Sequence, residues 1–216
     1  MIAAIVFDLD GVLIDSEAVW DSIREQVTRE RRGRWHERAQ QEMMGMSSLE
    51  WSRYMHESLG VRMAPEEISA LVVERIAERY RRALPLLPDA VETVRMLAQR
   101  WPLGLASSSN RPVIDLVLEL TALGPCFRTS VSSEEVRRGK PAPDVYLEAA
   151  RRLEVEPPRC AAVEDSTNGI RAASAAAMLV AAVPRPDFPP APDAIEHADL
   201  VLDSLAELPP ALERLA

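Results

Sequence analysis

Lysine is almost absent from this chain of 216 residues, which contains 24 arginines but only one lysine, Lys140. Cysteine and histidine are also scarce, with two and three residues, and neither occurs at a metal-binding spacing. We expect Cys126 and Cys160 to be buried free thiols. No Cys–His pair and no Ser–His–Asp order is evident, so the best candidate nucleophile is a carboxylate.

Long apolar runs are absent as well. The longest, residues 172–183, contains Ser174 and is too short to cross a bilayer. The N-terminus has no basic leader, and Asp8 interrupts its apolar run too early for a signal peptide. The net charge of -9 argues against a nucleic-acid partner. We therefore expect a soluble, cytoplasmic protein that binds neither nucleic acid nor membrane, and a monomer by default.

Short apolar runs, in contrast, recur along the chain. Residues 2–7 are continuously apolar, which is typical of a strand covered on both faces, as in a parallel sheet. Further runs of this kind, the last two of them weaker, lie at residues 103–106, 160–163, 178–183, 200–202 and 127–131. Segments with helical periodicity alternate with them, at residues 89–100, 112–123, 144–153, 168–177 and 204–215. The alternation predicts an α/β fold with a doubly wound, mainly parallel sheet.

Residues 16–86 break this alternation. They contain no convincing strand and several helical segments, of which residues 64–84 are the clearest. The segment carries 12 acidic and 12 basic residues, so the rest of the chain holds the whole net charge of -9. An insert that leaves the carboxyl end of the first strand lies over the edge where α/β sheets bind ligands. We predict an α/β catalytic core of residues 1–15 and 87–216 and a helical cap of residues 16–86.

Polar side chains end three of the predicted strands. They are Asp8 and Asp10, Ser107 and Ser108, and Glu164 and Asp165. Because the carboxyl ends of parallel strands meet at one edge, four carboxylates should converge there. A lone aspartate usually caps a helix or a turn, but capping does not explain the paired acids. Carboxylates this close would either raise each other's pKa steeply or need a cation. Oxygen ligands without histidine or cysteine nearby favour Mg²⁺ as that cation.

The single lysine supports an anion-binding site at this edge. Lys140 lies in the proline-bracketed stretch GKPAPD. A lysine in a loop is usually solvated, but in a chain so rich in arginine this one indicates that a compact point charge is needed where a planar guanidinium would not fit. Since the overall field of an acidic chain repels phosphate, local positive charge must attract it. The metal, Lys140 and a serine hydroxyl at the turn after the second predicted strand, Ser107 or Ser108, form a natural receptor for a phosphoryl group.

The order DLDG assigns roles to the first strand end. Asp8 attacks phosphorus and forms an aspartyl-phosphate, while Asp10 protonates the leaving oxygen and then activates water. Gly11 allows the backbone to turn close to the ligand, so that its N–H and that of Val12 can contact phosphate oxygens.

Four stretches taken together resemble the haloacid dehalogenase superfamily, specifically its helical-cap phosphatases, which include β-phosphoglucomutase-like and sugar-phosphate phosphatases. They are DLDGV at 8–12, LASSSN at 105–110, GKPAPDVY at 139–146 and VEDSTNGI at 163–170. The resemblance implies a Rossmann-like core, with residues 16–86 as a mobile cap that closes over the substrate. It also implies the following site: Asp8 as nucleophile, Asp10 as acid and base, Ser107 and Lys140 on the phosphoryl group, and Mg²⁺ on Asp8, the Asp10 carbonyl and Asp165, with Glu164 assisting.

Departures from the family pattern narrow the function. Asp10 favours phosphoryl chemistry, because the superfamily's dehalogenases lack this second aspartate. The β-phosphoglucomutases carry a histidine where this chain has Trp20 and a cap lysine where it has Met44. The stretch IDSEAVW at 14–20 is closer to the SEPLW of small-sugar and polyol phosphatases. We predict an Mg²⁺-dependent phosphatase acting on a small phosphorylated metabolite, with sugar or polyol phosphates as the expected class.

Two alternatives stay open. One is a phosphoglucomutase-like isomerase, and the other is a non-enzymatic, receiver-like phosphoacceptor module, which combines similar residues on an α/β sheet. Trp20, Met44, Met46 and Trp51 are candidates for the substrate pocket, although packing within the cap would explain them equally well. Arg24 or Arg53 could hold the second phosphate that a mutase needs, but we expect each to be a solvated charge on a helix face. Residues 184–192, which are rich in proline, should form a stiff surface loop.

Overall fold

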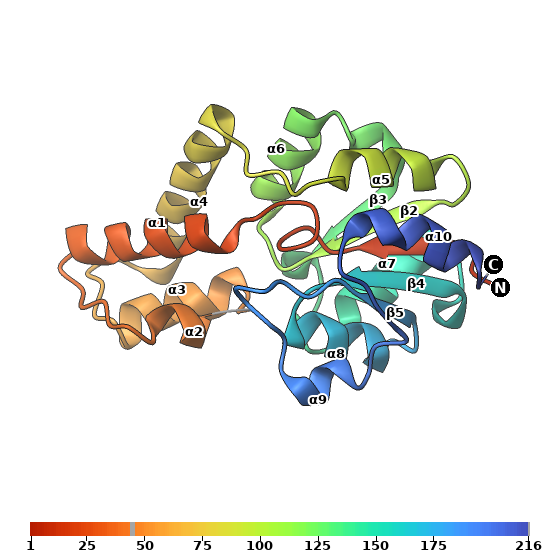
Figure 1. Cartoon of the computed structure of the whole chain (residues 1–216). Helices are drawn as coiled ribbons and strands as arrows, with labels where there is room; N and C mark the ends of the chain where they lie inside the picture. Colours follow the sequence, from red (N-terminus) through yellow and green to blue (C-terminus); the bar gives the residue numbers. More distant parts are fainter. Residues whose placement is uncertain (44–45, 216) are drawn as a thin grey trace.

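A six-stranded parallel sheet forms the centre of the computed structural model, which describes residues 1–43 and 46–215 (Figure 1). The strands are β1 Ala4–Phe7, β2 Leu103–Ser107, β3 Phe127–Ser132, β4 Cys160–Glu164, β5 Leu179–Ala182 and β6 Leu200–Val201. Their spatial order is β3-β2-β1-β4-β5-β6. The chain moves outward from β1 to β3 and then returns to place β4 on the other side of β1. The strand order therefore reverses between β1 and β4, the position where such sheets bind ligands.

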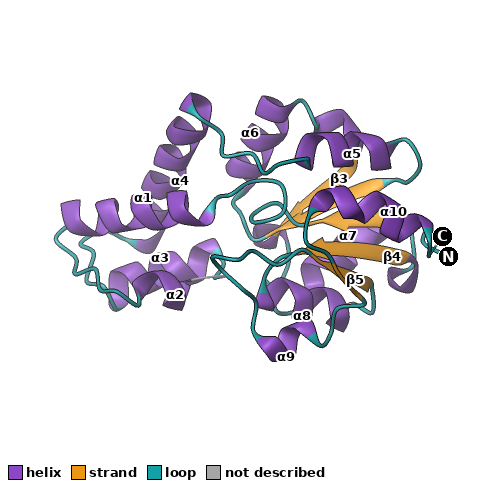
Figure 2. Ribbon diagram, viewed as in Figure 1, coloured by secondary structure: helices purple, strands orange, loops and turns teal. Residues whose placement is uncertain are grey.

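Helices cover both faces of the sheet, as Figure 2 shows. Successive residues of β1 face opposite sides: Ile5 and Phe7 pack into one apolar cluster, and Ala4 and Val6 into another. The first cluster also holds α5 Ala90–Ala98, α6 Arg111–Thr121 and α10 Leu208–Glu213, and the second holds α7 Asp144–Leu153, α8 Thr167–Ala175 and α9 Pro192–Ile195. This two-sided burial explains the continuously apolar strands and confirms the predicted α/β fold.

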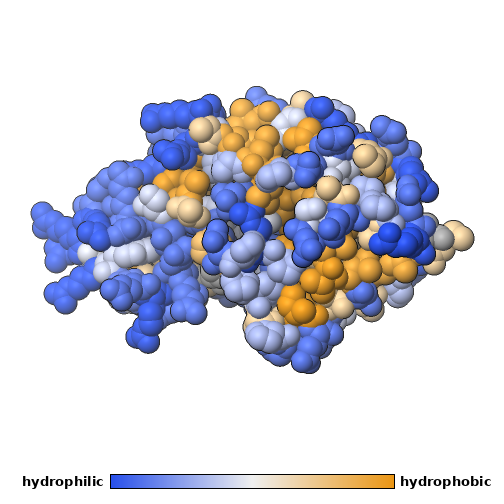
Figure 3. Space-filling view, viewed as in Figure 1, coloured by the Kyte–Doolittle hydropathy of each residue, from blue (hydrophilic) through white to orange (hydrophobic). Residues whose placement is uncertain are grey.

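Between β1 and β2 the described chain contains helices and no strand. Four of these helices precede α5, and they are α1 Glu17–Glu30, α2 Ala39–Met43, α3 Ser48–Glu57 and α4 Pro65–Arg82. Helix α4 buries one stripe, formed by Ile68, Val72, Ile76 and Tyr80, and it packs against α1, α3 and α6. The insert lies to one side of the sheet (Figure 1), and its surface is largely hydrophilic, whereas apolar side chains gather over the α/β part (Figure 3). Among the described residues, no helix has the length and hydropathy that crossing a membrane requires.

The C-terminal elements are shorter than the sequence predicts. Strand β6 comprises two residues, and the helix expected over 204–215 is a 3-10 turn, Leu205–Glu207, followed by α10. The prolines at 209 and 210 lie in the first turn of α10, where a missing N–H does no harm, so this helix begins late rather than being interrupted.

Candidate active site

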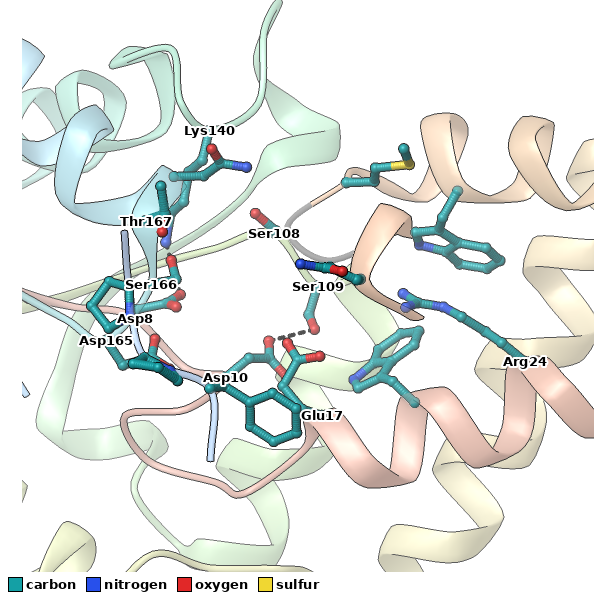
Figure 4. A pocket seen from close by; sticks show the side chains of 18 residues that line it. Asp8, Asp10, Glu17, Arg24, Ser108, Ser109, Lys140, Asp165, Ser166 and Thr167 are labelled. Atoms are coloured by element: carbon teal, nitrogen blue, oxygen red, sulfur yellow. Dashed lines mark hydrogen bonds and ion pairs between the residues drawn. The ribbon is translucent and has the colours of Figure 1, made fainter. Parts of the chain in front are cut away.

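Two neighbouring strand ends bring the acidic residues together. Strands β1 and β4 pair with Phe7 opposite Val163, so Asp8 and Asp165 leave the sheet at adjacent places. The Asp8 N–H donates to the Val163 carbonyl at 3.0 Å, which continues the ladder up to the first acid. Carboxylate oxygens of Asp8, Glu164 and Asp165 all lie within 4.8 Å of one another. Figure 4 shows Asp8, Asp10 and Asp165 on one side of a shared cavity.

Lys140 supplies the positive charge in this cluster. It is 7% exposed, and its Nζ lies 2.9 Å from Asp8 Oδ1 and 2.6 Å from Glu164 Oε1. The ring of Tyr146, on α7, lies under the ammonium at 5.0 Å, and its hydroxyl donates to the same Glu164 oxygen at 2.6 Å. The lysine is thus held in one position, between the first acid and a buried glutamate.

Glu164 is fixed by protein donors on both of its oxygens. Besides Lys140 and Tyr146 on Oε1, its Oε2 accepts from Asp165 N, Ser166 N and Ser166 Oγ at 3.1, 3.2 and 3.1 Å. A Cβ on Gly169 would lie 1.8 Å from Oε1, so the carboxylate rests directly against the first turn of α8. The main role of Glu164 is therefore to hold Lys140 and the start of α8 in place.

The electrostatics of the cluster show an excess of buried negative charge. The pKa of Asp8 is raised to about 8, chiefly by burial and also by the neighbouring Glu164 and Asp10, while Lys140 opposes the rise. Burial, Glu164 and Asp8 hold the pKa of Asp165 well above its usual range. Burial alone would lower the pKa of Lys140, but Asp8 and Glu164 outweigh it and raise that pKa. One lysine does not neutralise these acids, and a divalent cation would.

The donor set suits such a cation. Asp165 Oδ1 is buried and accepts no hydrogen bond from any residue in the described ranges. Gly11 has φ +78°, and a Cβ there would lie 1.8 Å from Asp165 Oδ2, so only glycine lets the turn after β1 pass this carboxylate. Oxygen ligands in this arrangement, without nitrogen or sulfur, fit Mg²⁺.

Two serines from the turn after β2 hold Asp10. Its Oδ2 accepts from Ser109 Oγ at 2.7 Å and from Ser107 Oγ at 3.2 Å, and the Ser109 N–H donates to Ser107 Oγ at 2.9 Å. Ser107 is fully buried behind Asp10, whereas Ser108 and Ser109 line the cavity. The sequence argument did not name Ser109, although it is the third serine of the LASSSN stretch.

The turn at Gly11 differs from expectation in one respect. The Gly11 N–H donates to the Ile14 carbonyl at 2.8 Å and is therefore not free for a phosphate oxygen. Val12 is fully buried and does not line the cavity. Gly11 thus serves the backbone turn.

The cavity has a volume of about 300 Å³ and three walls. The first wall is polar and lies at the strand ends, with Asp8, Asp10, Ser108, Ser109, Lys140 and Asp165. The insert provides the second wall, with Glu17, Trp20, Arg24, Gln41, Met46 and Trp51. The third wall comprises Ser166, Thr167, Asn168, Phe188, Pro189 and Pro190. The candidates Trp20, Met46 and Trp51 do line it, and Met44 lies outside the described residues.

One expectation about the walls is wrong. Arg24 is only 8% exposed and faces the cavity instead of solvent, whereas Arg53 is exposed as predicted. The proline-rich segment at 184–192 is a loop whose residues are mostly half-exposed or exposed, as predicted, but it also contributes Phe188 and its two following prolines to the cavity. An ion pair of 3.0 Å between Arg185 and Asp15 ties this loop to the connection before α1. Both contributions to the cavity depend on contacts between parts of the chain that are distant in sequence.

Comparisons with known proteins agree with this geometry. Residues 2–177 match the family model described as haloacid dehalogenase-like hydrolase. The chain is 33% identical over 226 residues to hexitol phosphatase B of Escherichia coli strain K12, covering 96% of this chain and 94% of that protein. It is 29% identical over 177 residues to the phosphorylated carbohydrates phosphatase of Thermotoga maritima, covering 80% and 81%. The crystal structure of CbbY from Rhodobacter sphaeroides in complex with phosphate, 24% identical over 96% of both chains, has the same fold, with a TM-score of 0.84.

Proposed function

Because this chain belongs to the family of haloacid dehalogenase-like hydrolases and is a phosphatase, we propose that it hydrolyses phosphate monoesters of small sugars or polyols through an aspartyl-phosphate on Asp8. The observation that carries the proposal is the convergence of Asp8, Asp10, Lys140 and Asp165 on one small cavity. The names of the relatives, a hexitol phosphatase and a phosphorylated carbohydrates phosphatase, support this class of substrate.

Two aspartates divide the chemistry. A carboxylate oxygen of Asp8 forms a bond to phosphorus while the bond between phosphorus and the ester oxygen breaks, and Asp10 donates a proton to the departing oxygen. Asp10 then removes a proton from water, whose oxygen attacks the same phosphorus and releases inorganic phosphate and free Asp8. The hydroxyls of Ser107 and Ser109 orient Asp10 for both steps, because both donate to its Oδ2.

Lys140 binds and neutralises the phosphoryl group. Its ammonium, 2.9 Å from Asp8 Oδ1, lies beside the attacking atom, where a phosphoryl oxygen would gain a charge-assisted hydrogen bond. Glu164 and Tyr146 keep the ammonium in this place and do not themselves line the cavity. Ser108, on the cavity wall, is placed for a further contact to the phosphoryl group.

Asp8, the Asp10 carbonyl and Asp165 would hold Mg²⁺, and Glu164, whose oxygens already accept protein hydrogen bonds, would contribute negative charge nearby. When bound, Mg²⁺ offsets the buried carboxylates and draws charge from the phosphoryl oxygens. The insert, residues 16–86, would act as the cap, since it provides one wall of the cavity and shields the reacting groups from water.

The test is phosphate release from a panel of sugar, polyol and aryl phosphates, with Mg²⁺ present or removed by EDTA. Asp8→Asn should abolish turnover, and Asp10→Asn should lower kcat by roughly 10²- to 10⁴-fold, the usual contribution of a positioned acid and base. Asp203→Asn, at an exposed position outside the cavity, is the matched control and should match the wild type. Retained turnover in Asp8→Asn, or isomer formation without phosphate release, would contradict the proposal.

A further inference from the structure

Arg24 carries a buried positive charge that no protein acid neutralises at close range. It extends from α1 into the cavity (Figure 4), and no hydrogen bond or ion pair joins its guanidinium to another described residue. Its Nε is buried without a partner. Burial lowers its pKa to about 10, although Glu17, Asp21 and Asp10 oppose the change from farther away. A buried cation with unused donors needs a partner from outside the protein.

Two tryptophans determine which donors remain usable. The guanidinium carbon lies 4.9 Å from the ring centroids of both Trp20, on α1, and Trp51, on α3. The two ring centroids are only 6.1 Å apart and the ring planes meet at 63°, so the rings form a corner on one side of the guanidinium and do not cover both of its faces. The rings hold the guanidinium in place, and its N–H donors on the open side can bind a ligand in the cavity.

Glu17 faces the same space two helical turns earlier on α1. It lines the cavity, and burial raises its pKa, while Arg24 opposes that rise. The two opposite charges nevertheless form no ion pair in the described structure, and Figure 4 shows them facing one another across part of the cavity. A group that can both accept from Arg24 and donate to Glu17 would complete this arrangement. Hydroxyl groups do both.

We propose that Arg24 and Glu17 bind adjacent hydroxyl groups of the substrate at the end away from the phosphoryl group, so that the enzyme selects polyol chains. This deepens the proposed function and rests on it. A distal carboxylate or phosphate would satisfy Arg24 but would be repelled by Glu17 and Asp10, both on the same cavity. An apolar end would leave the guanidinium without any partner.

The experiment compares three esters with the full-length protein in Mg²⁺. Sorbitol 6-phosphate has a hydroxyl chain, 6-phosphogluconate replaces its terminal hydroxymethyl by a carboxylate, and p-nitrophenyl phosphate has no distal hydroxyl. Arg24→Met should lower kcat/KM for sorbitol 6-phosphate, relative to p-nitrophenyl phosphate, by roughly 10- to 100-fold, as expected for losing one or two hydrogen bonds to a charged group. Glu17→Gln should lower the same ratio in the same direction. Arg53→Met, at an exposed arginine of α3, is the matched control and should keep the wild-type ratio.

Binding without turnover provides an independent measurement. In the Asp8→Asn background, calorimetry should give a dissociation constant for sorbitol 6-phosphate that Arg24→Met raises by roughly 10- to 100-fold. The inference is overturned if sorbitol 6-phosphate is not bound, if Arg24→Met changes sorbitol 6-phosphate and p-nitrophenyl phosphate equally, or if its loss falls on 6-phosphogluconate instead. Failure of the proposed function would look different, because the wild type would then release phosphate from none of the three esters.

Discussion

Asp8 combines a reactive position with an unfavourable environment. It is 6% exposed, and burial together with Glu164 and Asp10 disfavours its charged form, which is the form that would attack phosphorus in the proposed mechanism. Lys140 offsets only part of this, since it also neutralises Glu164. We therefore expect a bound Mg²⁺ to relieve the repulsion between these carboxylates, which the metal-free protein retains.

This repulsion predicts how Asp8→Asn changes stability with pH. The pKa of Asp8 is raised from 3.8 to about 8 on folding, so stability from its bound proton is fully present below about pH 4 and is lost as the pH rises through about 8. Asparagine carries no such proton. In EDTA the variant should therefore exceed the wild type in Tm by more at pH 9 than at pH 5, with each kcal/mol worth roughly 2–4 °C.

Calorimetric melts of both proteins at the two pH values measure this. Adding Mg²⁺ at pH 9 should narrow the difference, because the metal stabilises the wild-type carboxylate. Asp203→Asn is the control and should differ equally from the wild type at both pH values. If the difference in Tm between Asp8→Asn and the wild type does not grow with pH, the Asp8 carboxylate is not repelled by its neighbours.

At the scale of single residues, the sequence predicts the position of those site residues that directly follow a strand. Asp8 and Asp165 come directly after strands that pair with each other, so their meeting follows from strand order alone. The environment of Arg24 does not follow from strand order, because Trp20 and Trp51 contact it from two different helices. Amphipathic residues on a predicted helix carry no signal that another helix will cover them.

Among the elements, the junction of β4 and α8 contributes most to the site. Glu164 ends the strand and accepts the N–H groups of Asp165 and Ser166, which lead into the helix. Ser166 caps α8 by accepting from Gly169 N at 3.0 Å. Strand end, cap and first helical turn therefore form one hydrogen-bonded unit that also positions Lys140.

Gly169→Ala should break this unit. Alanine normally favours a helix over glycine by about 1 kcal/mol. Here its Cβ would lie 1.8 Å from Glu164 Oε1, an atom held by Lys140 and Tyr146, and the resulting overpacking should cost roughly 1–3 kcal/mol or more. We expect a lower Tm together with reduced kcat, since displacing Glu164 also displaces Lys140.

Gly124→Ala is the matched control, because a Cβ there would meet nothing within 4 Å. Thermal melts and kcat of both variants, measured side by side, decide the question. If Gly169→Ala and Gly124→Ala behave alike, the contact between Glu164 and α8 does not position the site.

The elements were predictable in proportion to their burial. Strands β1 and β4 are buried on both faces and stand out as apolar runs, whereas β6, at the edge, has two half-exposed or exposed residues and a weak pattern. The proline-rich segment at 184–192 contains no apolar run, so the sequence predicts only a surface loop there. Its contribution to the cavity depends on where β5 and the insert lie, and local composition contains no information on that.

At the scale of the whole molecule, the net charge of -9 opposes the proposed substrate. The positive groups on the cavity, Lys140 and Arg24, are both buried, so their fields extend little into solvent. Attraction of a phosphate ester is thus a short-range property of the site, and association should not rely on electrostatic steering.

Ionic strength tests this view. Raising KCl from about 0.02 M to about 0.3 M shortens the screening length from roughly 20 Å to under 8 Å, which weakens the overall repulsion but leaves the buried contacts nearly unchanged. At constant free Mg²⁺, kcat/KM should therefore stay level or rise by up to a few-fold. Repeating the series with tetramethylammonium chloride separates screening from specific binding of K⁺. A steep fall of kcat/KM in both salts would mean that long-range attraction, from charge outside this cavity, brings the substrate in.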